Sequence, residues 1–347
     1  MKRIAVLLLV VLQLGISGCV QGVTRYQAEF LSLFDTVTTI VGYSKNQSEF
    51  ASLAGQIKDK LTEYHRLFDI YNTYEGINNL KTINDNAGKT PVKVDKALVD
   101  MLLFAKEQYV LTGGKTNIAL GSVLEIWHDY REEGTLDPLD ATLPPAGMLE
   151  EAARHTDIED VVIDTEASTV YLSDPALRLD VGAVAKGYAV EKTAEWFENK
   201  GISSLLLSIG GNVRAIGGKP GGNGQEPWNI GIKNPDKESP VTELGNVLIT
   251  GYSVVSSGSY ERYYTVDGIR YNHIIDPDTL MPATYFAGVT LICRDSAVAD
   301  VLSTALFTMP LEKGKAFITA VDGVEALWIL NTGEIIYSEG FKNFLKE

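Results

Sequence analysis

The sequence is poor in cysteine, histidine and positive charge. Its 347 residues include 2 cysteines and 4 histidines, and 30 lysines and arginines stand against 45 aspartates and glutamates. Two cysteines cannot supply the framework of a disulfide-stapled domain. Cys293 lies in an apolar stretch, so we expect it to pack as a small apolar side chain. The net charge of −15 argues against nucleic-acid binding, because phosphates select a basic face.

Long apolar runs are also scarce, and the one at the N-terminus is short. It covers residues 4–12 and follows Lys2 and Arg3. A transmembrane helix needs roughly 20 apolar residues, so this run does not predict a membrane span. A short positive region followed by a short apolar run is typical of a signal peptide.

The end of this leader is its most specific feature. It reads Ile16-Ser17-Gly18-Cys19, which resembles the lipobox of bacterial lipoproteins. We therefore predict a lipoprotein signal peptide at residues 1–18, a lipidated tether at 19–26 and a catalytic domain at 27–347. Two or more acyl chains on Cys19 would hold the protein stably at a membrane. The alternative is an ordinary secretory signal with an incidental cysteine.

The remaining chain mixes helices and strands without strict alternation, which favours an α+β fold over a doubly wound sheet. We expect one catalytic unit of two intimately packed subdomains. Helical spacing is predicted at 49–67, 95–112, 184–200 and 297–307, extended structure at 34–43, 91–94, 204–209 and 289–293, a hairpin at 161–172, a turn-rich segment at 72–88, a surface loop at 134–145 and a closing helix and hairpin at 316–337.

Asp300 and Thr304 lie four residues apart in the predicted helix at 297–307, so they share one helical face. A carboxylate beside a hydroxyl offers hard oxygen ligands, which suit Mg²⁺ or Ca²⁺. The alternative is structural: Asp300 caps the helix and Thr304 bonds back to a carbonyl.

A second motif, residues 179–188, joins a strand end to a helix through small residues. Such a turn lets a ligand approach the backbone, and the helix N-terminus favours an anion. Lys186 stands in the first turn, where the helix dipole disfavours a cation unless an anion such as phosphate offsets it. A plain strand–helix connection with a solvated lysine is the alternative.

Glycines cluster at Gly210-Gly211 and again at residues 217–222. They could expose backbone N–H groups to a diphosphate, but they match neither the Walker A nor the dinucleotide fingerprint. A flexible loop is therefore the default interpretation. His273, in Asn272-His273-Ile274-Ile275-Asp276, is the histidine placed beside an acidic residue and a turn, where it could serve as a general base.

These motifs occur in one order, and together they resemble those of the FAD:protein FMN transferases. The resemblance covers nearly all of the chain beyond the leader and extends from Phe34-Asp35-Thr36 to Thr304. Its most specific parts are residues 180–188, residues 273–277 and the Asp300/Thr304 pair. The family motif often has Asp where this chain has Asn117 and Met where it has Phe34.

The resemblance implies a role for each matching residue. Asp300, Thr304 and the carbonyl of Ala183 would hold Mg²⁺, and His273 would assist the transfer. The residues implied to contact FAD are Phe34, Tyr71, Lys115, Thr116, Asn117, Asp180, Lys186 and Ile274, the last through its backbone.

The resemblance also implies the reaction and its place. FAD is the substrate, and FMN would pass to a threonine or serine of an extracytoplasmic flavoprotein of a membrane electron-transfer system, with release of AMP. The site would lie between the two subdomains, and the enzyme would be anchored on the outer side of the cell membrane. Two alternatives stay open: an FAD pyrophosphatase giving FMN and AMP, and an FAD-binding lipoprotein without turnover.

Overall fold

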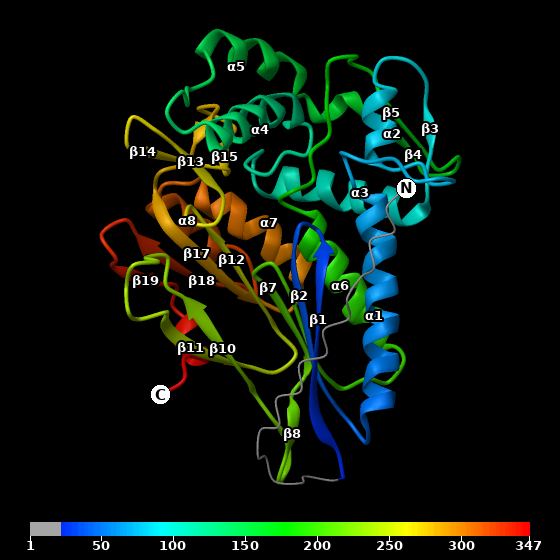
Figure 1. The fold of residues 1–347 in the computed structure, drawn as a ribbon, viewed down its shortest axis with the longest axis vertical. Helices are drawn as coiled ribbons and strands as arrows, with labels where there is room; N and C mark the ends of the chain where they lie inside the picture. The colour runs from blue at the N-terminus through cyan, green and yellow to red at the C-terminus, as the bar shows by residue number, and fades with distance from the viewer. Residues whose placement is uncertain (1–21) are drawn as a thin grey trace.

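A computed structural model describes residues 22–347 (Figure 1). The predicted signal peptide and Cys19 lie outside the described residues. Within residues 22–347, no helix has the length and apolar character required to span a membrane. Helices and strands are mixed without strict alternation, which confirms the predicted α+β fold class.

An eight-stranded antiparallel sheet forms the centre of the molecule. Its strands lie side by side in the order in which they occur along the chain, so the sheet is a meander interrupted by excursions. In that order they are β1 (Thr24–Leu33), β2 (Thr36–Ser44), β6 (Ser204–Ile209), β7 (Asn212–Gly217), β12 (Ser253–Gly258), β17 (Phe286–Cys293), β18 (Glu325–Leu330) and β19 (Ile335–Tyr337).

Strand β1 begins inside the segment that the sequence assigned to the tether. Thr24 pairs with Ser44 of β2, so residues 24–26 belong to the folded domain. Tyr26 and Phe30 face inward, and the ring of Tyr26 stacks on Phe50 with centroids 5.5 Å apart. Arg25, Gln27 and Glu29, which alternate with them, are polar.

The helices are α1 (Gln47–Leu67), α2 (Leu80–Asp85), α3 (Lys96–Leu111), α4 (Gly121–Leu136), α5 (Ala146–Ala152), α6 (Ala185–Glu198), α7 (Ser296–Phe307) and α8 (Leu311–Thr319). Short 3-10 helices cover Ala153–His155, Ile158–Asp160 and Phe341–Phe344. Asp95 caps α3 as predicted, through a bond from the backbone N–H of Ala97. The sequence interpretation missed α2, α4 and α5, and α4 extends into the predicted loop at 134–145.

Smaller sheets flank the central one. They are β3 (Val92–Lys93) with β5 (Thr169–Leu172) and β4 (Val161–Asp164), β8 (Lys219–Gly221) with β9 (Gly224–Glu226), β10 (Trp228–Lys233) with β11 (Glu243–Ile249), β13 (Tyr263–Val266) with β14 (Ile269–Asn272), and β15 (Ile275–Asp276) with β16 (Met281–Pro282). The β4–β5 pair is the predicted hairpin at 161–172.

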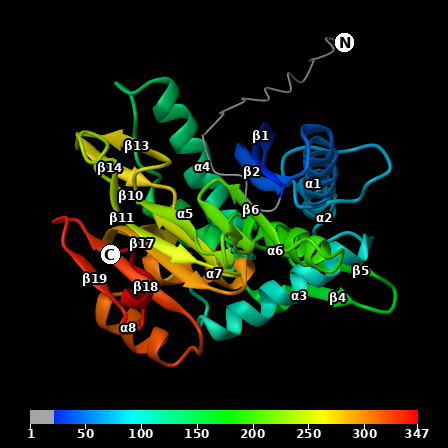
Figure 2. The same ribbon diagram turned by 90° about the horizontal axis from the view of Figure 1, so that it is seen from below.

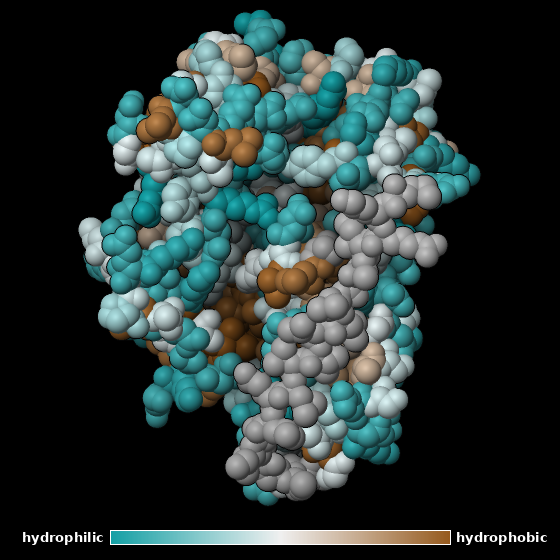
Figure 3. Space-filling model, viewed as in Figure 1, coloured by the Kyte–Doolittle hydropathy of each residue, from teal (hydrophilic) through white to brown (hydrophobic). Residues whose placement is uncertain are grey.

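The two faces of the central sheet bury different partners. Seen from below, α6 and α7 lie against one face and the β10–β11 hairpin lies on the other (Figure 2). The main core forms under the helices, and a second core joins β10–β11 to the sheet. A third, smaller core joins α4 to the β13–β16 excursion. The surface in Figure 3 is mostly hydrophilic, as the charged composition leads us to expect.

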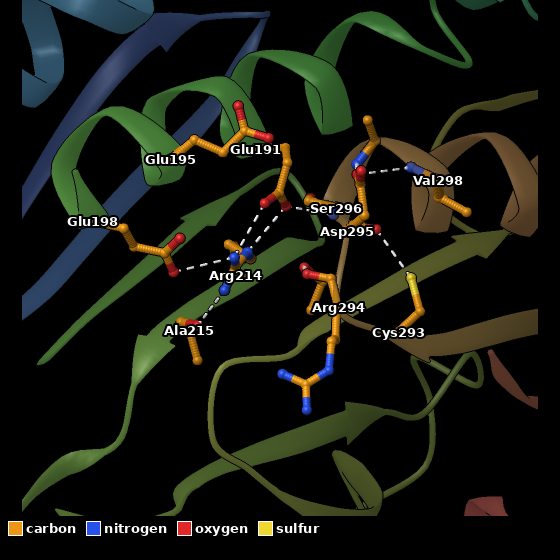
Figure 4. A network of polar contacts seen from close by, with 12 residues as sticks. Glu191, Glu195, Glu198, Arg214, Ala215, Cys293, Arg294, Asp295, Ser296 and Val298 are labelled. Carbon is orange, nitrogen blue, oxygen red and sulfur yellow. Dashed lines mark hydrogen bonds and ion pairs between the residues drawn. The ribbon is translucent and has the colours of Figure 1, made fainter. Parts of the chain in front are cut away.

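A buried ion-pair network fixes α7 against α6 (Figure 4). Arg214 of β7 donates to both carboxylate oxygens of Glu191 on α6, at 2.9 and 3.1 Å, and also to Glu198 at 3.2 Å. The backbone N–H of Ser296, the first residue of α7, donates to the same Glu191 carboxylate at 2.6 Å. Nearby, Cys293 is buried with 3% exposure, which confirms its predicted packing role.

One end of the sheet gathers the turns that matter for function. The β1–β2 turn, the β6–β7 turn and the β12–β17 excursion all leave the sheet at the upper end in Figure 1. The N-terminus of α6 reaches the same end, because α6 runs down the sheet to the start of β6. The β8–β9 hairpin lies at the opposite, lower end.

Candidate functional site

Helices α6 and α7 pack closely at Gly187. Its backbone N–H donates to Oδ2 of Asp300 at 2.8 Å. A Cβ atom at position 187 would lie 2.4 Å from Cβ of Asp300 and 2.4 Å from the carbonyl oxygen of Ser296. Only glycine therefore allows the two helices to approach so closely, and the approach brings Asp300, 3% exposed, to the first turn of α6.

This bond caps the first turn of α6. Gly187 is the third residue after the N-cap Val184, and an N–H at that position has no carbonyl partner within a helix. Here it donates to Asp300, and the Ala183 carbonyl accepts no backbone hydrogen bond from residues 22–347. Oδ1 of Asp300 likewise accepts no hydrogen bond from the described part of the chain. A carboxylate oxygen and a carbonyl oxygen are thus left free at one place.

Thr304 lies one turn further along α7, on the same face. The helices run antiparallel, because Glu191 meets Ser296 and, one turn on, Gly187 meets Asp300. The seam continues from Asp300 toward the start of α6, which Ala183 precedes, and Thr304 extends the same face of α7 in that direction. Carboxylate, carbonyl and hydroxyl oxygens are the type of ligand that a hard divalent cation prefers. No cluster of three or more His, Cys, Asp or Glu side chains suited to a metal occurs within residues 22–347, so a site of the zinc type is not offered there.

The structural alternative, in which Asp300 caps α7 and Thr304 bonds back to a carbonyl, holds for Thr304 but not for Asp300. Asp295, and not Asp300, caps α7, accepting from Ala297 N at 2.7 Å and Val298 N at 3.1 Å. The hydroxyl of Thr304 does bond back to the carbonyl of Asp300, at a long 3.4 Å. Asp300 therefore does not cap its own helix; it caps the first turn of α6 by accepting from Gly187 N.

Lys186, Asp180 and Tyr71 gather around the start of α6. The ammonium of Lys186 donates to the Gly182 carbonyl at 3.2 Å and lies 3.7 Å from Asp300. Protein oxygens thus already offset part of the charge that the helix dipole disfavours. Burial raises the pKa of Asp180, against the opposing effect of a bond from Gly182 N. Burial and the charge of Asp180 raise the pKa of Tyr71 to about 12, so its phenol stays protonated.

His273 lies on the β12–β17 excursion, where the charge of Lys186 contributes to lowering its pKa. Its backbone N and its Nδ1 both lie 3.1 Å from the carbonyl oxygen of Arg262. A carbonyl only accepts, so Nδ1 carries the proton and Nε2 keeps its lone pair. Burial and the charges of Arg262, Arg131 and Lys186 together lower the pKa of His273 to about 4, against the opposing effect of its hydrogen bond to the Arg262 backbone. The imidazole is neutral near pH 7 and able to accept a proton.

Residues 115–117 are held by contacts within the protein. Lys115 bridges Asp276 and Asp278 at 2.6 and 2.8 Å. Thr116 donates its hydroxyl to the carbonyl of Val301, and Asn117 donates its amide to that of Thr156. Ile274 is tied in the same way, because its N–H donates to the Asn272 side chain and its carbonyl accepts from Ala283 N. Their contacts with FAD stay predictions.

Phe34 lies in the two-residue turn between β1 and β2. Phe34 and Asp35 both have φ of +52°, a region that residues other than glycine rarely adopt. The Phe34 N–H donates to Nδ1 of His65 at 3.3 Å, and the two rings meet edge to face at 5.4 Å. This strained turn lies at the same end of the sheet as His273 and α6.

Four residues that border the site were missed by the sequence interpretation. His65 supports Phe34, and the His128 ring lies 5.5 Å from the Tyr71 ring. Arg131 contacts His128 at 2.7 Å, and Arg262 supplies the carbonyl that holds His273. His65, His128 and Arg131 lie on long helices. The helical pattern alone does not tell such residues from those that face solvent, because that depends on where the sheet lies.

The glycine clusters separate in the structure. Gly210 and Gly211 form the β6–β7 turn at the site end, where a Cβ atom on Gly210 would lie 2.7 Å from Oγ1 of Thr36. Residues 217–222 lead into the β8–β9 hairpin at the opposite end of the sheet. A diphosphate bound near Lys186 is out of reach of this second cluster, so only the first can serve the site.

Comparison with known proteins identifies the family. A family model described as "ApbE family" matches residues 34–328. The chain belongs to the ApbE family. The predicted resemblance is therefore confirmed.

Two relatives illustrate the breadth of the match, and both are named FAD:protein FMN transferase. The protein of Treponema pallidum (strain Nichols) is 31% identical over 97% of this chain and 93% of its own length. That of Escherichia coli (strain K12) is 28% identical over 85% of this chain and 83% of its own length.

Solved ApbE structures share the fold. The ApbE protein of Thermotoga maritima superposes with a TM-score of 0.80 at 29% identity, covering 93% of this chain and all of the other. The flavin transferase ApbE of Vibrio cholerae gives a TM-score of 0.76 at 25% identity, with the same coverage.

Proposed function

We propose that this protein is an FAD:protein FMN transferase that depends on Mg²⁺ and attaches FMN through a phosphoester bond. The transferase activity itself is supported by the family match and by relatives of that name along nearly the whole chain. The observation that carries the metal dependence is the contact of Asp300 with the first turn of α6. Oδ2 of Asp300 accepts from Gly187 N, whereas Oδ1 and the carbonyl of Ala183, just before the helix, accept no hydrogen bond from the described residues. Ca²⁺ could take the place of Mg²⁺ at such a site.

The proposed reaction is phosphoryl transfer. The oxygen of an acceptor threonine or serine bonds to the FMN phosphorus, and the bond from that phosphorus to the oxygen of the AMP phosphate breaks. AMP leaves with the bonding electron pair. Such a reaction needs positioning and charge neutralisation more than covalent participation by the enzyme. When bound at Asp300, Thr304 and Ala183, Mg²⁺ would neutralise the pyrophosphate.

The chain's own residues supply the rest of the proposed mechanism. Nε2 of His273 accepts the proton of the acceptor hydroxyl, because Nδ1 is held by Arg262 and the pKa of His273 keeps the ring neutral. Lys186 donates to the diphosphate, and the protonated phenol of Tyr71 borders the bound flavin nucleotide. Asp180, with its raised pKa, is a second group able to hold a proton nearby.

Hydrolysis of FAD to FMN and AMP would use the same residues with water as the acceptor. A binding protein without turnover would need neither the free oxygens nor a neutral histidine. The test incubates the protein with FAD, Mg²⁺ and a candidate acceptor. Transfer gives a fluorescent acceptor in a denaturing gel, and hydrolysis gives AMP without a labelled protein. FAD left intact after long incubation with the metal would reject both enzymatic proposals.

We also propose that Cys19 carries lipid and holds the enzyme on the outer side of the cell membrane. The support is the leader and the Ile16-Ser17-Gly18-Cys19 sequence. The protein partners would then be extracytoplasmic flavoproteins of membrane electron transfer. Mass spectrometry of the exported protein tests the modification: an unmodified Cys19 in membrane fractions would reject it.

A further inference from the structure

Lys115 is a nearly buried cation whose bonds all go to one loop. It lies between α3 and α4, and its side chain is 15% exposed. Its ammonium lies 2.6 Å from Oδ1 of Asp276 and 2.8 Å from Oδ2 of Asp278. Burial alone would lower the pKa of Lys115, but the hydrogen bonds to these two carboxylates outweigh it and raise the pKa. The ammonium is therefore charged near pH 7 and already paired.

Asp276 organises the loop that Lys115 holds. Its side chain is 5% exposed, and Oδ1 accepts from Lys115 and also from the N–H of Asp278 at 3.1 Å. Its carbonyl accepts from Leu280 N at 2.8 Å. Asp276 lies three residues after His273, in the short β15 strand, so a displacement of Asp276 is transmitted to the imidazole along a stiff, paired segment.

The next residue, Thr116, is tied to the opposite side of the site. Its hydroxyl donates to the carbonyl of Val301 at 3.2 Å, and Thr116 is 3% exposed. Val301 directly follows Asp300 in α7. Two consecutive residues therefore hold the helix that carries Asp300 and the loop that carries His273.

We propose that Lys115 is a positioning residue that sets His273 at a fixed distance from Asp300 and Thr304, and that its ammonium does not bind the phosphates of FAD. The carboxylates of Asp276 and Asp278 already occupy its ammonium, so the substrate's phosphates do not compete for it. This inference rests on the proposed function, because His273 is the base of that reaction.

The test is Lys115→Met, alone and combined with His273→Gln, followed by AMP release at saturating Mg²⁺. Lys115→Met is expected to lower kcat at least 10-fold and to leave the Kd for FAD within twofold. In the His273→Gln background it is expected to lower kcat less than twofold further, because the base it positions is gone. Lys115→Arg, which keeps the charge, is expected to retain kcat within about threefold.

Lys60→Met is the matched control, since Lys60 pairs with Glu63 on α1 at 26% exposure. It should change neither kcat nor the Kd for FAD.

Removing one partner of a buried pair can unfold a protein, so Lys115→Met/Asp276→Asn is tested as well, because it leaves no buried carboxylate unpaired. The double variant is expected to show the same loss of kcat at an unchanged Kd for FAD.

Two results would overturn the proposal: a weaker Kd for FAD with kcat unchanged, or rate losses of Lys115→Met and His273→Gln that multiply. The imidazole resonances of His273 in ¹⁵N-resolved NMR test the positioning without turnover. Lys115→Met should shift or broaden them, and Lys60→Met should not. Unshifted resonances would reject the proposal even if the protein turned over no FAD, whereas wild-type protein inert toward FAD with shifted resonances would reject only the proposed function.

Discussion

Gly187 donates its backbone N–H to the carboxylate of Asp300 at 2.8 Å, so a side chain of α7 closes the first turn of α6. An N–H in the first turn of a helix has no carbonyl partner within that helix, so Asp300 serves as its cap, while Oδ1 of Asp300 and the carbonyl of Ala183 accept no hydrogen bond from the described residues. One hydrogen bond between two helices therefore joins the packing of the core to the free oxygens of the site.

Gly187→Ala should destabilise the fold and weaken the metal site together. The new methyl group would lie 2.4 Å from Asp300 Cβ, and overpacking of this kind costs about 1–3 kcal/mol. Urea unfolding and Mg²⁺ titration measure the two effects. Gly55→Ala is the matched control, since it lies in α1 with no atom within 4 Å of the new Cβ. It should stabilise the protein by about 0.4–1 kcal/mol. Equal stability of both variants would contradict the packing argument.

Asp300→Asn should separate metal binding from folding. The amide oxygen can still accept from Gly187, so the free energy of unfolding should change by less than about 1 kcal/mol. The charge that attracts Mg²⁺ is gone, so we expect Mg²⁺-dependent AMP release to fall at least about 100-fold, or about 3 kcal/mol in the barrier. Wild-type rates in this variant would reject the metal assignment.

The pH profile of kcat/KM should lack the acid limb that a histidine with an ordinary pKa would give. Because the pKa of His273 is lowered from 6.5 to about 4, kcat/KM should show no inflection from this residue between about pH 5.5 and 8. The unfolded chain takes up the proton first as pH falls below 6.5. The free energy of unfolding should therefore decline as pH falls from 6.5 toward 4, and His273→Gln should remove that part of the decline. An acid limb near pH 6.5 that disappears in His273→Gln would contradict the neutral state of the imidazole.

Arg214→Met should destabilise the fold more than any surface ion-pair variant. It leaves Glu191 buried without its partner, and breaking such a pair typically costs about 3–5 kcal/mol. Lys96→Met, at the exposed Lys96–Asp100 pair, should cost less than about 1 kcal/mol. Replacing the buried pair as a unit, with Glu191→Leu and Arg214→Met, should recover much of the loss in urea unfolding.

Much of the fold follows from local sequence. The long amphipathic helix α1 and the apolar helix α7 match their predicted ranges closely, because periodicity and caps are local signals. Strand β1 and helix α4 were missed for the opposite reason. Their faces become meaningful only against β2 and the β13–β14 hairpin, which come later in the chain.

The residue types of the site could be predicted from the sequence, but the contacts between those residues could not. Spacing placed Asp300 and Thr304 on one face, yet nothing in the sequence indicates that Gly187, 113 positions away, donates to that carboxylate. Likewise, the bridge from Lys115 to Asp276 spans 161 positions. Long-range pairing through the sheet creates these contacts, and a single sequence carries no local signal for them.

Strand β1 runs from Thr24 at the lower end of the sheet to Leu33 beside the site, in Figure 1. Ten extended residues cover about 30 Å. A chain held by lipid at Cys19 would enter the fold at the lower end and present its catalytic end away from the bilayer. Acceptors would therefore have to meet the enzyme some 30 Å above the membrane, which favours flavin-bearing domains that project from the surface over loops lying within it.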